Sequence, residues 1–204
     1  MINYNRLFCV LAIIMLFQYC NTVPELNLKK LPTVEAQDSF TDLRDGTAYP
    51  VVKINDQVWL AGAIEYVVPG SLCPENDASK CLTFGRLYSS AEASKACPSG
   101  WRLPSDEEYK KLWISLDAPA GSSTFYAPYQ YVFDTYFSVK EAGYYNNADK
   151  AFYNLNSNTY LLTTTLADEL NATIYSLSFN PAGLFVQRIR GGLNNRFTCL
   201  CIKN

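Results

Sequence analysis

The sequence of 204 residues contains no histidine. This absence excludes Ser-His-Asp and Cys-His nucleophile systems, zinc sites with histidine ligands and the HExxH motif. A glycine-rich phosphate loop behind a strand is also missing, as is a CxxC pair. We therefore predict no catalytic residues, no metal site and no cofactor, and we expect a protein that is not an enzyme.

Basic residues are also few. Seventeen Lys and Arg stand against 19 Asp and Glu, which leaves a formal net charge of −2. Nucleic-acid binding draws most of its affinity from Lys and Arg that neutralise phosphates, so we expect no nucleic-acid partner. The one basic cluster, Arg188, Arg190 and Arg196, we interpret as solvated charges near a turn.

The N-terminus has the features of an export signal. Arg6 gives a short positive region, and residues 7–17 (LFCVLAIIMLF) form an apolar run too short to span a bilayer comfortably. Cys20 follows where bacterial lipoproteins are cleaved and lipid-modified, although Tyr19 is bulky at a position where a small residue is usual. We predict a signal peptide over residues 1–19 and lipidation of Cys20, with ordinary secretion or a periplasmic location as the alternative.

The organisation of the mature chain follows from this leader. Residues 20–40 are polar, carry Pro24 and Pro32 and show no sustained period, which is typical of a tether. One folded domain is expected over residues 41–204. The lipid at Cys20 would hold this domain at the cell envelope, on the outer membrane or the cell surface, so the membrane is a predicted partner.

Export also accounts for the number of cysteines. Cys9 lies in the leader and Cys20 at the anchor, and an oxidising compartment favours two disulfides and one leftover thiol among the rest. The remaining five are Cys73, Cys81, Cys97, Cys199 and Cys201. A bridge across the polar segment PENDASK, between Cys73 and Cys81, would close a short loop.

Two helices are predicted on either side of the segment ACPSGWRLPS, residues 96–105. Ser89 with Glu92, and Ser105 with Glu108, have the spacing of reciprocal N-terminal caps. The second helix has an apolar stripe at i, i+3, i+4 and i+7 that predicts a core-facing side. The stripe consists of Tyr109, Leu112, Trp113 and Leu116.

The other regular segments read as strands. A hairpin is expected around Asn55-Asp56 and a second one around residues 180–183, with a further strand over residues 160–166. The last strand is predicted to be RFTCLCIKN. Since side chains alternate along a strand, Phe197, Cys199 and Cys201 would share one face.

The second half of the chain is rich in tyrosine and asparagine. Tyrosine rings stack on sugar faces and amides bond to hydroxyls, so this composition suits carbohydrate binding. It also suits ordinary loop packing, in which a buried tyrosine finds one hydrogen-bond partner, and packing is the favoured interpretation. The candidate ligand contacts are Tyr129, Tyr131, Tyr145, Asn146 and Asn147.

Several sequence runs resemble one known family. The runs CLTFGRLYS and ACPSGWRLPS are specific, and RDG, AGYYN, FYNL and the terminal FTCLCIK accompany them. Together they cover residues 42–204 and resemble the Fibrobacter succinogenes major paralogous domain. The resemblance implies an exported, often lipid-anchored bacterial surface protein without assigned catalysis. It also implies an α+β, C-type-lectin-like fold with two helices packed on a mainly antiparallel sheet, long loops and a disulfide-stapled scaffold.

The resemblance further implies how the cysteines pair. Cys73 would bridge Cys81, and Cys97 would bridge Cys201, which ties the joint between the helices to the last strand. Cys199 is outside the family pattern and is expected to be a buried free thiol. It can scarcely bridge Cys201, because the two lie only two residues apart on a strand.

The chain also departs from the family pattern. Gly62 and Ala63 stand where an acid and an amide are usual, and Leu161 and Leu162 stand where an aromatic pair is usual. The calcium–sugar triplets of true C-type lectins, such as Glu-Pro-Asn, are missing. Calcium-dependent sugar binding is therefore not implied.

Three functions remain open. The preferred one is a non-catalytic recognition module for polysaccharide or for another surface protein. The alternative is a structural envelope protein without a soluble ligand. The related fold also includes formylglycine-generating oxidases, which use a reactive cysteine pair, so Cys199 and Cys201 are the candidates for an enzymatic function; Cys201, however, is expected to be structural.

Overall fold

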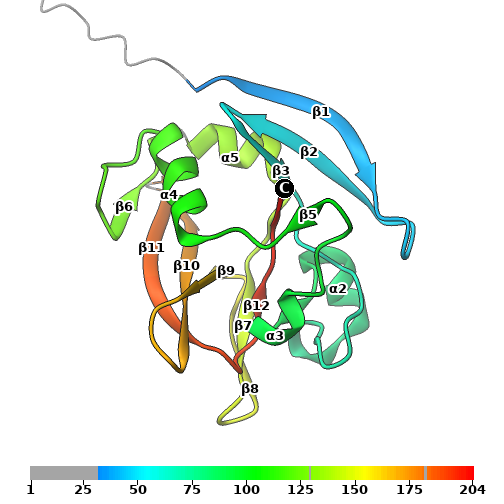
Figure 1. Ribbon diagram of the computed structural model, residues 1–204. Coiled ribbons are helices and arrows are strands. Elements are labelled where there is room, and N and C mark those ends of the chain that lie inside the picture. Colours follow the sequence, from blue (N-terminus) through cyan, green and yellow to red (C-terminus); the bar gives the residue numbers. More distant parts are fainter. Residues whose placement is uncertain (1–31, 129, 182) are drawn as a thin grey trace, which may run out of the picture. The chain divides into compact units, whose positions relative to one another are not determined.

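Strands supply most of the regular structure in the computed structural model, which describes residues 32–128, 130–181 and 183–204 (Figure 1). The predicted signal peptide, Cys20 and the tether up to residue 31 lie outside the described residues. The described residues contain four α-helices and one 3₁₀-helix, so the predicted α+β class is confirmed. The helices are η1 (Pro74–Asn76), α2 (Ala78–Phe84), α3 (Ser90–Ala93), α4 (Asp106–Ser115) and α5 (Gln130–Tyr136).

Two sheets are built from these strands. The first has the order β1-β2-β3-β13-β5 and is antiparallel throughout. Its members are β1 (Val34–Thr41), β2 (Ala48–Ile54), β3 (Gln57–Leu60), β5 (Trp101–Arg102) and β13 (Cys201–Lys203).

The second sheet has the order β4-β12-β9-β10-β11-β6, with the hairpin of β7 and β8 joined to β9. Most of its pairings are antiparallel; β12 and β7 each run parallel to β9. Its members are β4 (Leu87–Tyr88), β6 (Thr124–Tyr126), β7 (Ala142–Asn146), β8 (Ala151–Leu155), β9 (Thr159–Leu166), β10 (Asn171–Asn180), β11 (Gly183–Gly192) and β12 (Phe197–Thr198). Both predicted hairpins, β2–β3 and β10–β11, are present.

Strand β1 corrects the predicted start of the domain. It begins at Val34, inside the segment that was predicted to be tether, and Val34 pairs with Ile54 across β2. Five consecutive side chains of β1 are exposed, so the strand has no two-residue alternation that sequence reasoning could detect. Main-chain pairing with β2 and the packing of Phe40 on Trp101, with ring centroids 5.4 Å apart, hold β1 in place.

The two predicted helices α3 and α4 are confirmed together with their caps. In α4, Glu108 N donates to Ser105 Oγ at 3.3 Å, and Ser105 N donates to a Glu108 carboxylate oxygen at 2.8 Å. The same reciprocal bonds join Ser89 and Glu92 in α3. The predicted apolar stripe of α4 is buried along its whole length.

Helices α2 and α5 were not predicted. In α2 only Cys81 is buried, so the sequence has no apolar face; Asp77 caps this helix by accepting a hydrogen bond from Ser79 N. Helix α5 buries Val132 and Phe133 from an aromatic stretch that reads as loop. Tertiary contacts decide the helical state in such short segments, because isolated helices of this length are unstable.

The C-terminal segment was predicted to be one strand, and the structure divides it. Residues of β12 pair in the second sheet and residues of β13 pair in the first, so the chain crosses from one sheet to the other between them. The predicted alternation is nevertheless confirmed. Phe197, Cys199 and Cys201 belong to one core cluster, around Tyr88, while Leu200 and Ile202 belong to a second cluster that contains Trp59 and Trp113.

Both disulfides implied by the resemblance are present. Cys73 and Cys81 are bridged with a Cα–Cα distance of 4.9 Å, and Cys97 and Cys201 with a Cα–Cα distance of 5.8 Å. The second bridge joins residues 104 positions apart in the sequence. It links the joint between α3 and α4 to β13, and so fixes the position of α4 against the sheets.

Candidate functional site

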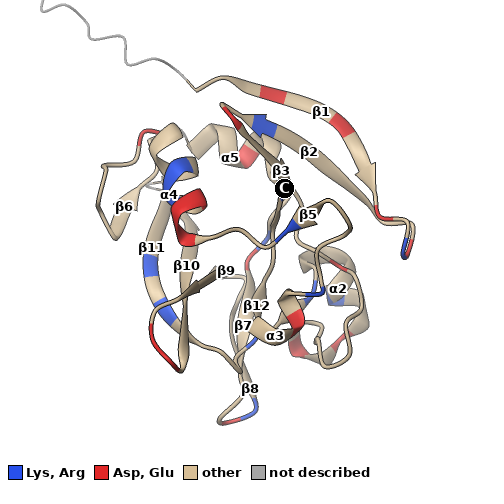
Figure 2. Cartoon of the chain, viewed as in Figure 1, with Lys and Arg blue, Asp and Glu red and all other residues tan. Residues whose placement is uncertain are grey.

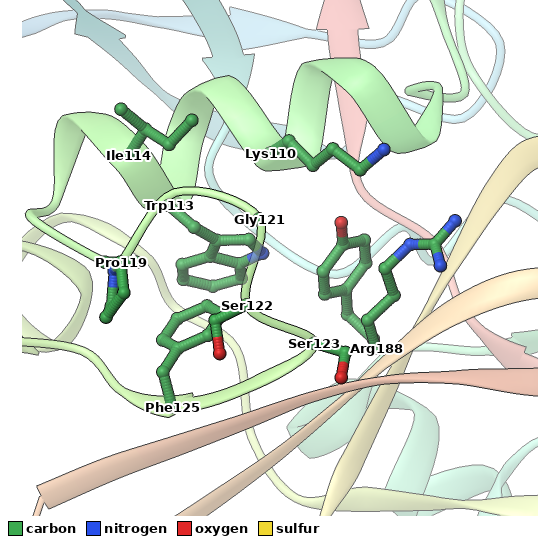
Figure 3. A pocket seen from close by; sticks show the side chains of 11 residues that line it. Lys110, Trp113, Ile114, Pro119, Gly121, Ser122, Ser123, Phe125 and Arg188 are labelled. Carbon is green, nitrogen blue, oxygen red and sulfur yellow. The ribbon is translucent and has the colours of Figure 1, made fainter.

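A cavity of about 220 Å³ lies beside α4 and is the best candidate for a binding site (Figure 3). One wall comes from α4, another from the segment after it up to β6, and the remainder from β10 and β11. The polar side is formed by Lys110, Tyr175 and Arg188. The apolar side is formed by Trp113, Ile114, Ala118, Pro119 and Phe125.

The buried carboxylate of Asp106 organises the polar side. Arg188 donates from Nε and Nη2 to the two Asp106 oxygens, each at 2.7 Å. The Tyr175 hydroxyl donates to Oδ1 at 2.9 Å, and Lys110 Nζ lies 2.9 Å from Oδ2. Asp106 is only 3% exposed, so these contacts replace its water.

Local sequence rules explain how these side chains meet. Asp106 and Lys110 are four residues apart on α4 and therefore share a helix face. Tyr175 and Arg188 are direct partners in the β10–β11 pairing, so their side chains lie on the same side of the sheet. Figure 2 shows the acidic first turn of α4 beside the basic positions of β11. Packing of α4 on this hairpin then closes the cluster.

The electrostatics of the cluster favour the charged form of Asp106. Burial by itself would raise the pKa of this carboxyl, but hydrogen bonds from Arg188, Lys110 and Tyr175 outweigh burial and lower the pKa to about 2. The same contacts raise the pKa of Arg188, and burial followed by the charge of Asp106 raises the pKa of Tyr175. All four groups therefore keep their neutral-pH charge state over a wide range.

Trp113 provides the most unusual feature of the apolar side. Its ring packs against Phe125, Phe133 and Tyr175 with centroid distances of 6.2, 5.7 and 6.1 Å, and the residue is 2% exposed. Its indole Nε1 is buried and has no hydrogen-bond acceptor among the described residues. Figure 3 shows the nitrogen edge of the ring turned toward the side of the cavity where Lys110 and Arg188 lie. A buried donor without an acceptor is costly, by about 1–3 kcal/mol.

The structure does not gather the predicted ligand contacts into one site. Tyr129 lies outside the described residues. Tyr131 is on α5 and is 56% exposed, whereas Tyr145 and Asn146 end β7 and Asn147 begins the turn to β8. Figure 1 shows α5 and this hairpin at opposite ends of the described domain.

The three residues at the hairpin turn have structural contacts. The ring of Tyr145 packs on Phe152, with centroids 4.9 Å apart, and beneath the guanidinium of Arg196, which is 5.5 Å from the ring centroid. Asn146 Oδ1 accepts from Ala148 N, and Asn147 N donates to Asn195 Oδ1. These contacts support loop packing, which was the favoured interpretation.

The prediction that Arg188, Arg190 and Arg196 are solvated charges is wrong for Arg188 and Arg196. Arg188 is bonded to Asp106, and Arg196 pairs with Glu92 at 3.0 Å, with only 17% of its side chain exposed. Arg190 alone is largely solvated, with 73% of its side chain exposed. Sequence reasoning missed these pairs because the partners lie 82 and 104 residues away.

The sequence pattern placed Trp113 only in the core-facing stripe and did not identify Asp106 as a site residue. The i, i+4 spacing of Asp106 and Lys110 was the one local signal of a charged cluster on α4. Of the residues that depart from the pattern of the resembled family, Ala63, Leu161 and Leu162 are buried.

Cys199 is the unpaired cysteine among the described residues, and it is fully buried. Burial raises the pKa of its thiol well above the ordinary value, so little thiolate forms at neutral pH. We expect iodoacetamide to leave Cys199 unmodified in the folded protein and to alkylate it in 8 M urea, as measured by peptide mass spectrometry. Rapid alkylation of Cys199 under native conditions would contradict this burial.

No family model, no curated protein and no solved structure matches the chain. No helix in the described part of the chain has both the length and the apolar character needed to cross a membrane.

Proposed function

We propose that this chain is an exported, lipid-anchored surface protein that acts as a non-catalytic recognition module. The observation that carries the proposal is the cavity beside α4. It combines apolar walls with a few converging polar groups, which is the usual composition of a ligand site. The Asp106 cluster and the Cys97–Cys201 bridge hold its walls in place, so the site is formed before any ligand arrives.

The proposal includes the cellular location predicted from the N-terminal segment: a signal peptide over residues 1–19, a lipid on Cys20, and a place on the outer membrane or cell surface. The two disulfides support this location, because such bridges persist in oxidising compartments. The C-type-lectin-like fold and the family resemblance belong to the same proposal. They are supported by the two cysteine pairings that the resemblance implied.

The state of the cysteines argues against an oxidase. A catalytic sulfur must be accessible and must have a low pKa. Cys199 is buried with a raised thiol pKa, and Cys201 is held in a disulfide.

A protein partner is favoured over polysaccharide. Sugar recognition by tyrosine and asparagine needs those residues gathered on one accessible face, whereas here they are divided between α5 and the β7–β8 turn. The cavity walls are mainly apolar, and Ile114 at the wall on α4 is 52% exposed. An apolar side chain from a partner protein fits such an opening better than a ring of hydroxyls.

Photo-crosslinking in cells tests this function. A photoreactive phenylalanine in place of Ile114, in the full chain, is expected to yield one discrete heterologous adduct. The same replacement at Leu43, which is 94% exposed and does not line the cavity, is the matched control and should yield none. No adduct at position 114, or identical adducts at both positions, would contradict recognition through this cavity. Adducts only between copies of the chain would favour the structural alternative, and glycan-array binding without an adduct would favour polysaccharide.

A further inference from the structure

The size of the cavity limits its ligand. Cavities of about 150 Å³ lined by apolar side chains bind benzene, so a cavity of about 220 Å³ holds one six-membered ring and a short substituent. Trp113, Phe125 and Pro119 can surround such a ring (Figure 3). A sugar of the same size would place several hydroxyls against these apolar walls without hydrogen-bond partners.

The charge of the polar side indicates what the substituent is. Lys110 and Arg188 carry two positive charges there, and the buried carboxylate of Asp106 balances one of them. The second anionic contact of Lys110 is Glu107, whose side chain is 75% exposed. Exposed ion pairs contribute little and are readily exchanged, so a ligand anion can replace Glu107 at Lys110.

One buried hydrogen-bond donor at the cavity, Trp113 Nε1, has no acceptor among the described residues. Arg188 donates from Nε and Nη2 to Asp106, and its side chain is still 37% exposed, so its positive charge remains open to a ligand. A carboxylate has acceptor oxygens and one negative charge, so it matches this donor and the positive charges of Lys110 and Arg188 together.

We infer that the cavity beside α4 binds a ligand group made of one aromatic ring and one carboxylate, with the ring against Trp113 and the carboxylate toward Lys110 and Arg188. This inference rests on the proposed recognition function. Two sources offer the same chemistry: a free aromatic acid, and the C-terminal aromatic residue of a protein chain.

Calorimetric titration of the full chain, purified in detergent, distinguishes the sources. The probes are 3-phenylpropanoate and the peptide Gly-Gly-Phe with a free C-terminus. Each has a neutral amide counterpart as its control, and glucuronate tests an acidic sugar. At least one of the two acids is expected to bind about tenfold more tightly than its amide, because a charged hydrogen bond is lost in the amide. Binding of the peptide alone would identify a chain end, and binding of 3-phenylpropanoate a free acid.

Variants of α4 test the geometry. Lys110→Met is expected to weaken binding of the acid about tenfold, while Lys111→Met, on the same helix but outside the cavity, should leave it unchanged. Trp113→Phe keeps an aromatic ring but removes the N–H, and should weaken binding several-fold; near-ultraviolet circular dichroism checks that it folds. Lys110→Met leaves the Arg188 and Tyr175 contacts of Asp106 in place, so this test stands even if Trp113→Phe is unstable.

Four results would overturn the inference. Two concern affinity: acids and amides that bind equally well, or a folded chain that binds no ring acid. The others are equal effects of the two lysine variants and a preference for glucuronate. If photo-crosslinking gives an adduct at position 114 but no ring acid binds in the titration, only the proposed ligand class is contradicted. The recognition function would then stand with a different ligand.

Discussion

Removal of the Cys97–Cys201 disulfide, by alanine at both positions, is expected to lower the free energy of unfolding by up to about 4.7 kcal/mol. The bridge closes a loop with a sequence separation of 104, and the entropy that a crosslink removes from the unfolded chain grows with loop length. Urea unfolding of the oxidised full chain, followed by circular dichroism, measures the loss. Because a domain is stable by only about 5–15 kcal/mol, this change consumes a large share of the total.

The Cys73–Cys81 bridge provides the matched control. Its sequence separation is 8, and the same relation between loop length and entropy gives about 2.5 kcal/mol when both cysteines are replaced by alanine. The loss should therefore be clearly larger for the long-range bridge. Equal losses, or a larger loss for the Cys73–Cys81 pair, would show that chain entropy does not govern the stabilisation.

The substitution Asp106→Asn is expected to lower the free energy of unfolding by about 3 kcal/mol at pH 7. Asparagine keeps the size of the side chain but removes the charge that holds Arg188 and Lys110, and it presents an amide donor where donors already converge. Asp56→Asn, in the exposed turn between β2 and β3, is the matched control and should change stability by less than about 0.5 kcal/mol. Thermal and urea unfolding of both variants measure the difference.

The pH dependence of the same variant gives a sharper test. The folded-state pKa of Asp106 is about 2, below its ordinary value of 3.8, so the folded state binds this proton less readily than the unfolded state. The resulting stabilisation, about 2 kcal/mol, is complete well above pH 3.8 and is lost as the pH falls toward 2. Asp106→Asn lacks this contribution, so wild type and variant should converge in stability as the pH is lowered from 5 to 2.

Some acid sensitivity should remain in Asp106→Asn. The hydrogen bond from Arg102, opposed by burial and assisted by Ser105, lowers the pKa of Glu108 to about 2, and this carboxylate is unchanged in the variant. A stability gap between wild type and variant that stays constant from pH 5 to pH 2 would contradict the assigned state of Asp106.

Local patterns were predictable because their causes lie within a few residues. The caps of α3 and α4 need only a serine and a glutamate three positions apart, and the stripe from Tyr109 to Leu116 needs only helical periodicity. The two faces of the segment from Phe197 to Ile202 follow from strand alternation alone. By contrast, β1 and α5 carry no such internal pattern, since main-chain pairing and tertiary packing stabilise them.

The sequence by itself determined that histidine chemistry is impossible here and that two capped helices form, and its cysteine count predicted two disulfides and one leftover thiol. Only the tertiary structure decided where the cavity lies. The pairing of β10 with β11 and the packing of α4 bring Asp106 to Arg188 across 82 residues. The nitrogen edge of Trp113 is turned toward the side of the cavity where Arg188 lies (Figure 3). A cavity is the space left between elements, so its position depends on how those elements pack and not on any short run of residues.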